Sequence, residues 1–160
     1  MKSSTFLKQH HDEVRTIFKQ LENSNGNTEA LLKKLADSLA AHMVIEQELF
    51  YPAVLRVNED LVLEGYEEHA VARFALKRLM KSSPVDRTFK ARVTTLKEII
   101  EDHAEEEEQE LFPKAEEALG DTSEDLCQRM KRLFDETLKA GYESTVGRGG
   151  PAVTSASAPI

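Results

Sequence analysis

The sequence predicts an all-α protein, an up-down-up-down four-helix bundle with a short fifth C-terminal helix. Three observations support this fold class: five segments with helical spacing of apolar residues, short joints between the first four, and few helix breakers. Seven Gly and five Pro occur among 160 residues, and there is no Trp. We expect one helical bundle over residues 1–142 and a flexible tail rich in Gly, Ser, Ala and Pro over residues 143–160.

The first two expected helices flank a turn-rich stretch, residues 23–27. Before it, apolar residues recur at spacings of three, four and seven; after it, Thr28 can serve as the N-cap of a second helix. The inward face of the second helix also carries the polar residues His42 and Glu46. The two apolar stripes are Leu7, Val14, Ile17, Phe18 and Leu21, and then Leu32, Leu35, Leu39, Leu49 and Ala53.

Three more helices are expected. The third begins near Asn58 and ends before Ser-Ser-Pro at 82–84, and the longest runs over about residues 89–120 to a glycine, a common helix stop. The fifth, shorter helix covers about residues 122–140. The inward stripes are Val62, Tyr66, His69, Arg73, Leu76 and Met80; Phe89, Val93, Leu96, Ile100, His103, Glu107 and Leu111; and Leu126, Met130, Leu133 and Leu138.

Charge and motif content exclude several function classes. The net charge of −8 would repel phosphate backbones and anionic lipids, so we expect no nucleic-acid and no membrane partner. Cys127 is the single cysteine, and there is no HExxH, glycine-rich phosphate loop or nucleophile motif. Residues 1–11 hold no apolar signal segment and no run resembles a membrane span. We expect a cytoplasmic protein, a monomer or weak homo-oligomer.

Histidine placement is the strongest functional signal. Each of the first four expected helices carries at least one histidine on its inner face, and no histidine lies elsewhere. A buried imidazole needs partners for its ring nitrogens, and buried carboxylates are costly unless they are paired or bind a metal. Histidines and glutamates converging in one layer of the bundle therefore indicate a metal site. The five histidines are His10, His11, His42, His69 and His103.

The spacing of the polar residues suits two metal ions. Residues four apart share a helix face, so His42 and Glu46 can present a nitrogen and an oxygen to one volume, and His103 can do so with Glu107 or Glu108. Nitrogen and oxygen donors without thiolate favour iron, manganese or zinc. Two bridging carboxylates with two histidines per ion describe a dinuclear centre.

Four separated stretches carry a resemblance to a known family. They are LKQHHDEV (7–14), HMVIEQELFYPA (42–53), EEHAVAR (67–73) and HAEEEEQELFP (103–113). In this order, over about the first 120 residues, they resemble the hemerythrin-like, or HHE, family of non-haem di-iron proteins. The resemblance implies a helical bundle, two iron ions with carboxylate and oxo bridges, and chemistry with a small ligand: O2, H2O2 or NO.

The resemblance also implies a ligand set. In the first helix it selects His11 over His10, between which periodicity does not choose. In the fourth, regular helix geometry favours Glu107, whereas aligning the two EQELF segments, together with the family's spacing, favours Glu108 with a local π-bulge. We adopt Glu108 and keep Glu107 as the alternative. The expected metal ligands are His11, His42, Glu46, His69, His103 and Glu108.

Arg73 departs from the pattern of the family's oxygen carriers, which place a fifth histidine there. An arginine cannot ligate a metal because it stays protonated. Its head either reaches solvent past the bundle rim or supports the site from outside. The iron held by His69 and His103 would then have an extra site for water, peroxide or a phenol, with Tyr51 and Tyr66 as candidates. We therefore expect peroxide removal, a catalase-like activity, ahead of O2 or NO binding.

Other function classes stay open. Iron storage or ferroxidase activity on a ferritin-like bundle expects Glu-x-x-His on two helices, but the residues three positions before His42, His69 and His103 are Leu, Tyr and Ile. An O2- or iron-sensing binding module is a further alternative. A metal-free helical interaction module would keep its melting temperature on chelation, whereas a bound metal would stabilise the fold.

Overall fold

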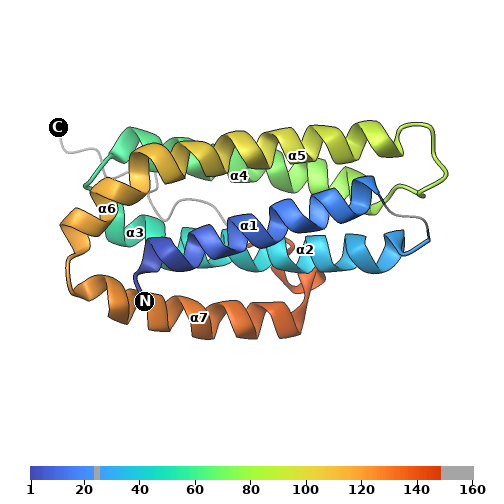
Figure 1. Ribbon diagram of the computed structural model, residues 1–160. Coiled ribbons are helices and arrows are strands. Elements are labelled where there is room, and N and C mark those ends of the chain that lie inside the picture. Colours follow the sequence, from blue (N-terminus) through green and yellow to red (C-terminus); the bar gives the residue numbers. More distant parts are fainter. Residues whose placement is uncertain (24–25, 149–160) are drawn as a thin grey trace.

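The computed structural model describes residues 1–23 and 26–148, and every regular element in these ranges is helical (Figure 1). None of these helices is both long and apolar enough to cross a membrane. The elements are α1 (Ser3–Glu22), α2 (Thr28–Ile45), η1 (Glu46–Phe50), α3 (Tyr51–Val54), α4 (Glu59–Met80), α5 (Phe89–Glu106), η2 (Glu107–Leu111), α6 (Phe112–Leu119), α7 (Thr122–Ala140) and η3 (Tyr142–Thr145).

The predicted all-α bundle is confirmed. Four rods form it: α1, α2–η1–α3, α4 and α5–η2–α6, with α1 beside α2 and α4 beside α5 (Figure 1). The apolar core has two parts, one around Leu7, Phe50 and Val62 and the other around Ile17 and Leu76. The polar histidine positions fall between these two parts along each rod, so a buried polar layer is enclosed by apolar packing on both sides.

The fifth helix covers a side of the bundle. α7 has 19 residues and lies along α2 and α1 as a further layer, away from α4 and α5 (Figure 1). The reason lies in α2, which is buried on almost every side from Leu35 to Ile45 and so needs cover on its outer face. Leu126, Met130 and Phe134, at a spacing of four, supply it.

Most helix ends follow the expected signals. The Asn58 side chain caps α4 by accepting a hydrogen bond from the Leu61 N–H at 3.3 Å. Asn27 takes the N-cap position of α2, and Thr28 is its first residue rather than its cap. Of the expected tail, residues 143–145 belong to η3, which begins at Tyr142, and residues 149–160 lie outside the described residues.

Two of the rods contain a π-helical turn just before a proline. η1 ends two residues before Pro52, and η2 ends two residues before Pro113. Proline has no N–H for the regular helical hydrogen bond and its ring clashes with the preceding turn. A widened turn changes the hydrogen-bonding pattern at this point, and the rod continues past each proline. The same turns begin at Glu46 and Glu107, and so set the positions of two buried carboxylates.

Candidate metal centre

Four buried histidines meet midway along the bundle, one from each rod. The Nε2 atoms of His11 and His42 are 3.1 Å apart, and those of His69 and His103 are also 3.1 Å apart. Two imidazole nitrogens this close either share a proton or bind one ion, since both point into the same space. The structure thus brings the four expected histidines together as two facing pairs.

Glu46 lies between the two pairs. One of its oxygens, Oε1, is 3.1 Å from His42 Nε2, and the other, Oε2, is 3.2 Å from His69 Nε2. The side chain is fully buried, yet neither oxygen accepts a hydrogen bond from a described residue. An ionised carboxylate in such surroundings is costly unless a cation neutralises it. Glu46 therefore fits a ligand shared by two ions.

Glu107 is the second buried carboxylate. Its Oε2 is 3.4 Å from His11 Nε2 and 3.6 Å from His103 Nε2, so it also lies between a histidine of each pair. This oxygen too is buried without a hydrogen-bond partner among the described residues. Ligand atoms within 4.8 Å of one another form two overlapping sets: His11, His42, Glu46 and Glu107, and then Glu46, His69 and His103. We refer to these six residues as the buried ligand group.

Glu108, which we expected from the sequence as the ligand, lies outside this group. Its carboxylate forms ion pairs with Lys8 and with Arg15 at 3.0 Å, near the surface. The expected π-turn is present, but it begins at Glu107, so His103 and Glu107 keep the regular spacing of four. The structure therefore gives the buried position to Glu107.

A different alignment of the two similar segments would have indicated Glu107. His42 and Pro52 are ten residues apart, and so are His103 and Pro113. Aligned on histidine and proline, Glu46 matches Glu107, and both π-turns start at the same point. In this alignment the two EQELF segments are offset by one residue. Their sequence similarity therefore does not indicate which glutamate is equivalent to Glu46.

Protonation of the metal-free group follows from its carboxylates. Burial alone would lower the pKa of His11, but the nearby carboxylates of Glu107 and Glu108 outweigh it and raise that pKa to about 9. Burial also opposes the charged form of His103, yet the charge of Glu107 and a hydrogen bond to Glu68 raise its pKa to about 9. Both imidazoles are therefore doubly protonated and positively charged near neutral pH. A metal ion must displace one of these protons to bind.

Tyr51 makes the two pairs of histidines chemically different. Its hydroxyl donates to Glu107 Oε1 at 2.8 Å and lies 3.3 Å from His69 Nε2 and 3.4 Å from His103 Nε2. Burial, with the nearby Glu107, raises the pKa of this phenol well above its usual value, so it keeps its proton. At the equivalent position of the other rod, nine residues after the histidine, stands Phe112. Within residues 1–23 and 26–148, only the His69–His103 pair therefore has a phenol oxygen beside it.

His10 points away from the buried ligand group. Its ring packs against Phe6 and Phe134, with ring centres 4.5 and 3.9 Å away. Burial lowers the pKa of His10 to about 3, so the ring is neutral. Of the two adjacent histidines, His11 faces the centre and His10 faces α7.

Arg73 and Tyr66 reach Gln47 and not the buried ligand group. The Arg73 Nη2 donates to the Gln47 side-chain oxygen at 2.7 Å, and the Tyr66 hydroxyl donates to the Gln47 backbone oxygen at 3.0 Å. Because Gln47 follows Glu46 in η1, both side chains steady the turn that carries this carboxylate.

Two outer carboxylates orient histidines of the group. Glu68 hydrogen-bonds Nδ1 of His103, and Glu108 lies 2.9 Å from Nδ1 of His11. Carboxylates in this position fix the ring orientation of a metal-bound histidine and increase its basicity. Sequence reasoning did not identify Glu68. Its place directly before His69 was the only available signal.

The role of Glu68 can be tested by the change Glu68→Gln. We expect it to weaken metal binding about 10- to 100-fold, because removing an outer partner of a ligand histidine has costs of this size. Affinity is measured by competition with a chromogenic chelator. Glu67→Gln is the matched control, since Glu67 is exposed and the change removes the same charge at the adjacent position. Equal affinities for the two variants would contradict this role.

A small cavity adjoins the histidines. Its volume is about 10 Å³, room for about one water-sized molecule. Apart from the four imidazoles, its walls are apolar, so a molecule placed there meets few competing hydrogen bonds. The lining residues are His11, Val14, Leu39, His42, Met43, His69, Ile100, His103 and Ala104.

Comparison with known proteins agrees with this geometry. Residues 3–115 match the family model of the hemerythrin HHE cation-binding domain. A crystal structure of a hemerythrin HHE cation-binding domain-containing protein from Mycobacterium kansasii superposes with a TM-score of 0.81 at 21% identity, over 94% of this chain and 95% of the other. The chain is also 30% identical over 109 residues, 66% of its length, to a protein from Nostoc sp. described as a DNA nickase. It spans 31% of the length of that relative.

Proposed function

Because the chain belongs to the hemerythrin HHE cation-binding family, we propose that it holds two non-haem iron ions and removes peroxide. His11 and His42 would hold one ion, and His69 and His103 the other. Glu46 and Glu107 would bridge the two ions, since each lies between a histidine of one pair and a histidine of the other.

The donor set supports iron. Four imidazole nitrogens and two carboxylates, with no thiolate, suit iron better than copper(I), which prefers soft sulfur ligands. Three buried carboxylate oxygens, two on Glu46 and one on Glu107, have no hydrogen-bond partner among the described residues. Buried acceptors are nearly always satisfied, and a pair of cations would satisfy these.

The size of the cavity carries the functional proposal. About 10 Å³ beside the four histidines is room for about one water-sized molecule, so the cavity limits a guest to the smallest ligands and excludes a larger organic substrate. A pair of iron ions, when bound, supplies the electron exchange that peroxide disproportionation needs.

The side chains of this protein contribute binding and proton positions. Tyr51 holds a protonated hydroxyl beside the His69–His103 pair, the one described O–H group that lies there, and can donate it to a peroxide oxygen. In the resting state the same hydroxyl donates a hydrogen bond to Glu107. Arg73 stays outside, so the face of this pair is not filled by a further protein nitrogen.

The proposal predicts oxygen release from peroxide. Two H2O2 give one O2 and two H2O with no added reductant, so the iron-loaded protein should turn over alone. An oxygen electrode gives the ratio of O2 released to peroxide consumed, and one to two is expected. Free iron at the same concentration and the Glu46→Gln protein are the controls. Oxygen release no faster than free iron would reject peroxide removal and leave O2 or NO binding, which azide and NO difference spectra would then test.

The description of the Nostoc relative does not extend to this chain. The shared segment is under a third of that protein, and a net charge of −8 opposes binding to a phosphate backbone. Iron storage is also disfavoured, because the Glu-x-x-His pattern of ferritin-like bundles is absent from the sequence.

A further inference from the structure

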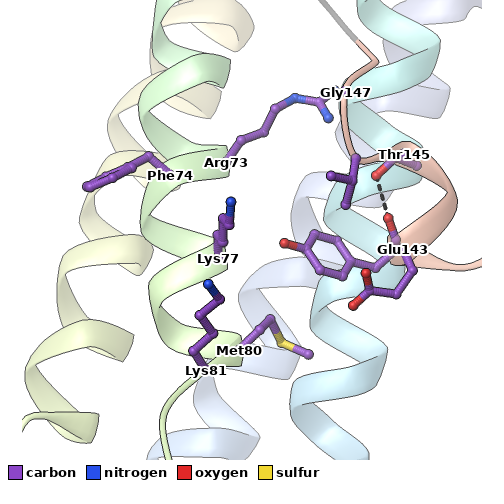
Figure 2. A pocket seen from close by; sticks show the side chains of 10 residues that line it. Arg73, Phe74, Lys77, Met80, Lys81, Glu143, Thr145 and Gly147 are labelled. Atoms are coloured by element: carbon purple, nitrogen blue, oxygen red, sulfur yellow. Dashed lines mark hydrogen bonds between the residues drawn. The ribbon is translucent and has the colours of Figure 1, made fainter.

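A second pocket lies outside the bundle core, between α4 and the segment that contains η3 (Figure 2). Its volume is about 430 Å³, within the range of small-ligand sites in proteins. It shares no residue with the buried ligand group. Arg73, which has no ligand role at the metal centre, lines it together with Lys77 and Lys81.

Three cations from one face of α4 line this pocket. Arg73, Lys77 and Lys81 are spaced by four residues, and Lys77 and Lys81 extend along the same side of the helix (Figure 2). Glu143 is the one acidic residue of the lining. Neither lysine side chain makes an ion pair or hydrogen bond with another residue of the described ranges. Like charges at this spacing repel, so a bound anion would relieve the strain.

The helix dipole alone does not explain why all three cations lie here, because Arg73 is too far from the end of α4. Cations in the last turn of a helix interact favourably with its dipole, and this accounts for Lys77 and Lys81 in part. Arg73 lies two turns earlier, and its guanidinium extends across toward Gly147 (Figure 2). One amino group is bonded to Gln47, and Nε is buried without a partner in the described part of the chain.

Hydrogen bonds within the protein hold the opposite wall of the pocket in place when no ligand is bound. The Tyr142 N–H donates to Asp37 at 2.8 Å, and the Thr145 hydroxyl donates to the Tyr142 carbonyl at 2.7 Å. Arg148 then binds Glu48 through two hydrogen bonds of 3.0 and 2.6 Å. A pocket whose walls are already ordered loses little entropy when a ligand binds.

The lining also has an apolar part, from Met80 and Val146. We propose that this pocket binds a phosphate monoester that carries an apolar group. Three cations against one acid leave a surplus of two positive charges, which matches a phosphate dianion better than a single carboxylate. The guanidinium group of arginine and the ammonium group of lysine commonly bind phosphate in proteins. The apolar group would lie on Met80 and Val146.

Isothermal titration of the protein as purified with phenyl phosphate tests this proposal. We expect saturable binding at one site, and at least about tenfold weaker binding after Lys77→Ala with Lys81→Ala, because two charge-assisted contacts are lost. Lys90→Ala with Lys114→Ala is the matched control: both residues are exposed, the charge change is the same, and affinity should stay within about twofold. No saturable binding, or equal losses in the two double variants, would overturn the proposal.

A second variant and two analogues separate the contributions. Val146→Glu places a negative charge at an exposed wall residue, so it should weaken phenyl phosphate binding without disturbing the fold. Inorganic phosphate should bind more weakly than phenyl phosphate, and benzyl alcohol should not bind. A visible spectrum unchanged by phenyl phosphate would show that the anion is away from the metal ions. Binding of benzyl alcohol as tight as that of phenyl phosphate, or a spectral shift abolished by Glu46→Gln, would contradict an anion site in this pocket.

Discussion

Replacing Glu46 by glutamine is expected to empty both halves of the metal centre. Glu46 touches a histidine of each pair, at 3.1 and 3.2 Å, so its loss affects both ions at once. An outer partner of a ligand histidine contributes about 10- to 100-fold to affinity, and a direct bridging carboxylate contributes at least as much. The amide keeps the shape of the side chain but not its charge, so the fold should persist.

Two measurements check this expectation: metal content after dialysis, and the melting temperature with and without chelator. For the unaltered protein, chelation should lower the melting temperature, because bound metal stabilises only the folded state. For Glu46→Gln, chelation should have almost no effect. Glu110→Gln is the control, since Glu110 is exposed and lies in η2, the turn that carries Glu107. Full metal content in the Glu46→Gln protein would contradict the bridging role.

Gly65→Ala should destabilise the protein through Tyr51. A Cβ at residue 65 would lie 2.7 Å from the Tyr51 hydroxyl oxygen and 3.0 Å from its Cζ, closer than atoms can pack. The Tyr51 ring is fully buried and cannot move aside freely. Overpacking of this kind costs about 1–3 kcal/mol, and a lost hydrogen bond to the Glu107 carboxylate adds about 1.5–3 kcal/mol. Alanine regains about 1 kcal/mol of helix propensity, so destabilisation wins.

A double-mutant cycle with Tyr51→Phe gives the decisive comparison. Phenylalanine removes the hydroxyl oxygen, the atom nearest to the added Cβ. Gly65→Ala should therefore cost clearly less free energy of unfolding in the Tyr51→Phe protein than in the unaltered one. Urea unfolding measures both costs. Strictly additive costs would show that Gly65 is needed for some reason other than the position of Tyr51.

Much of the fold could be read from the sequence because helical spacing of apolar residues is a strong, local signal. His42, His69 and His103 were placed on inner faces by the same spacing that placed Leu39 and Ile100. The position of the fifth helix could not be read in this way. It depends on α2 being buried on nearly all sides, and the sequence of α7 alone does not say which helix it covers.

The parts of the site that the sequence left open or did not indicate depend on small rotations or on neighbours distant in sequence. Glu107 and Glu108 differ by one position, and the start of the π-turn decides between them. Tyr51 was one of two candidate phenols, and only its contact with Glu107, from another rod, separates it from Tyr66. Glu68 acts on His103, 35 residues away, and spacing within one helix cannot reveal that contact.

The two similar segments now have a physical reading. Each places a glutamate four residues after a histidine and a proline six residues after the glutamate: His42, Glu46 and Pro52, then His103, Glu107 and Pro113. Each begins its π-turn at the glutamate. Repeating this pattern on two rods produces two carboxylates that meet between two pairs of histidines, the arrangement a dinuclear metal site requires.

Metal content per chain tests the central claim most directly. The protein is purified from cells grown without added metal, and the metals are measured by elemental analysis against protein concentration. The six residues of the buried ligand group, with two carboxylates placed between two pairs of histidines, lead us to expect about two iron ions per chain. One ion or none per chain, or zinc in place of iron, would contradict it.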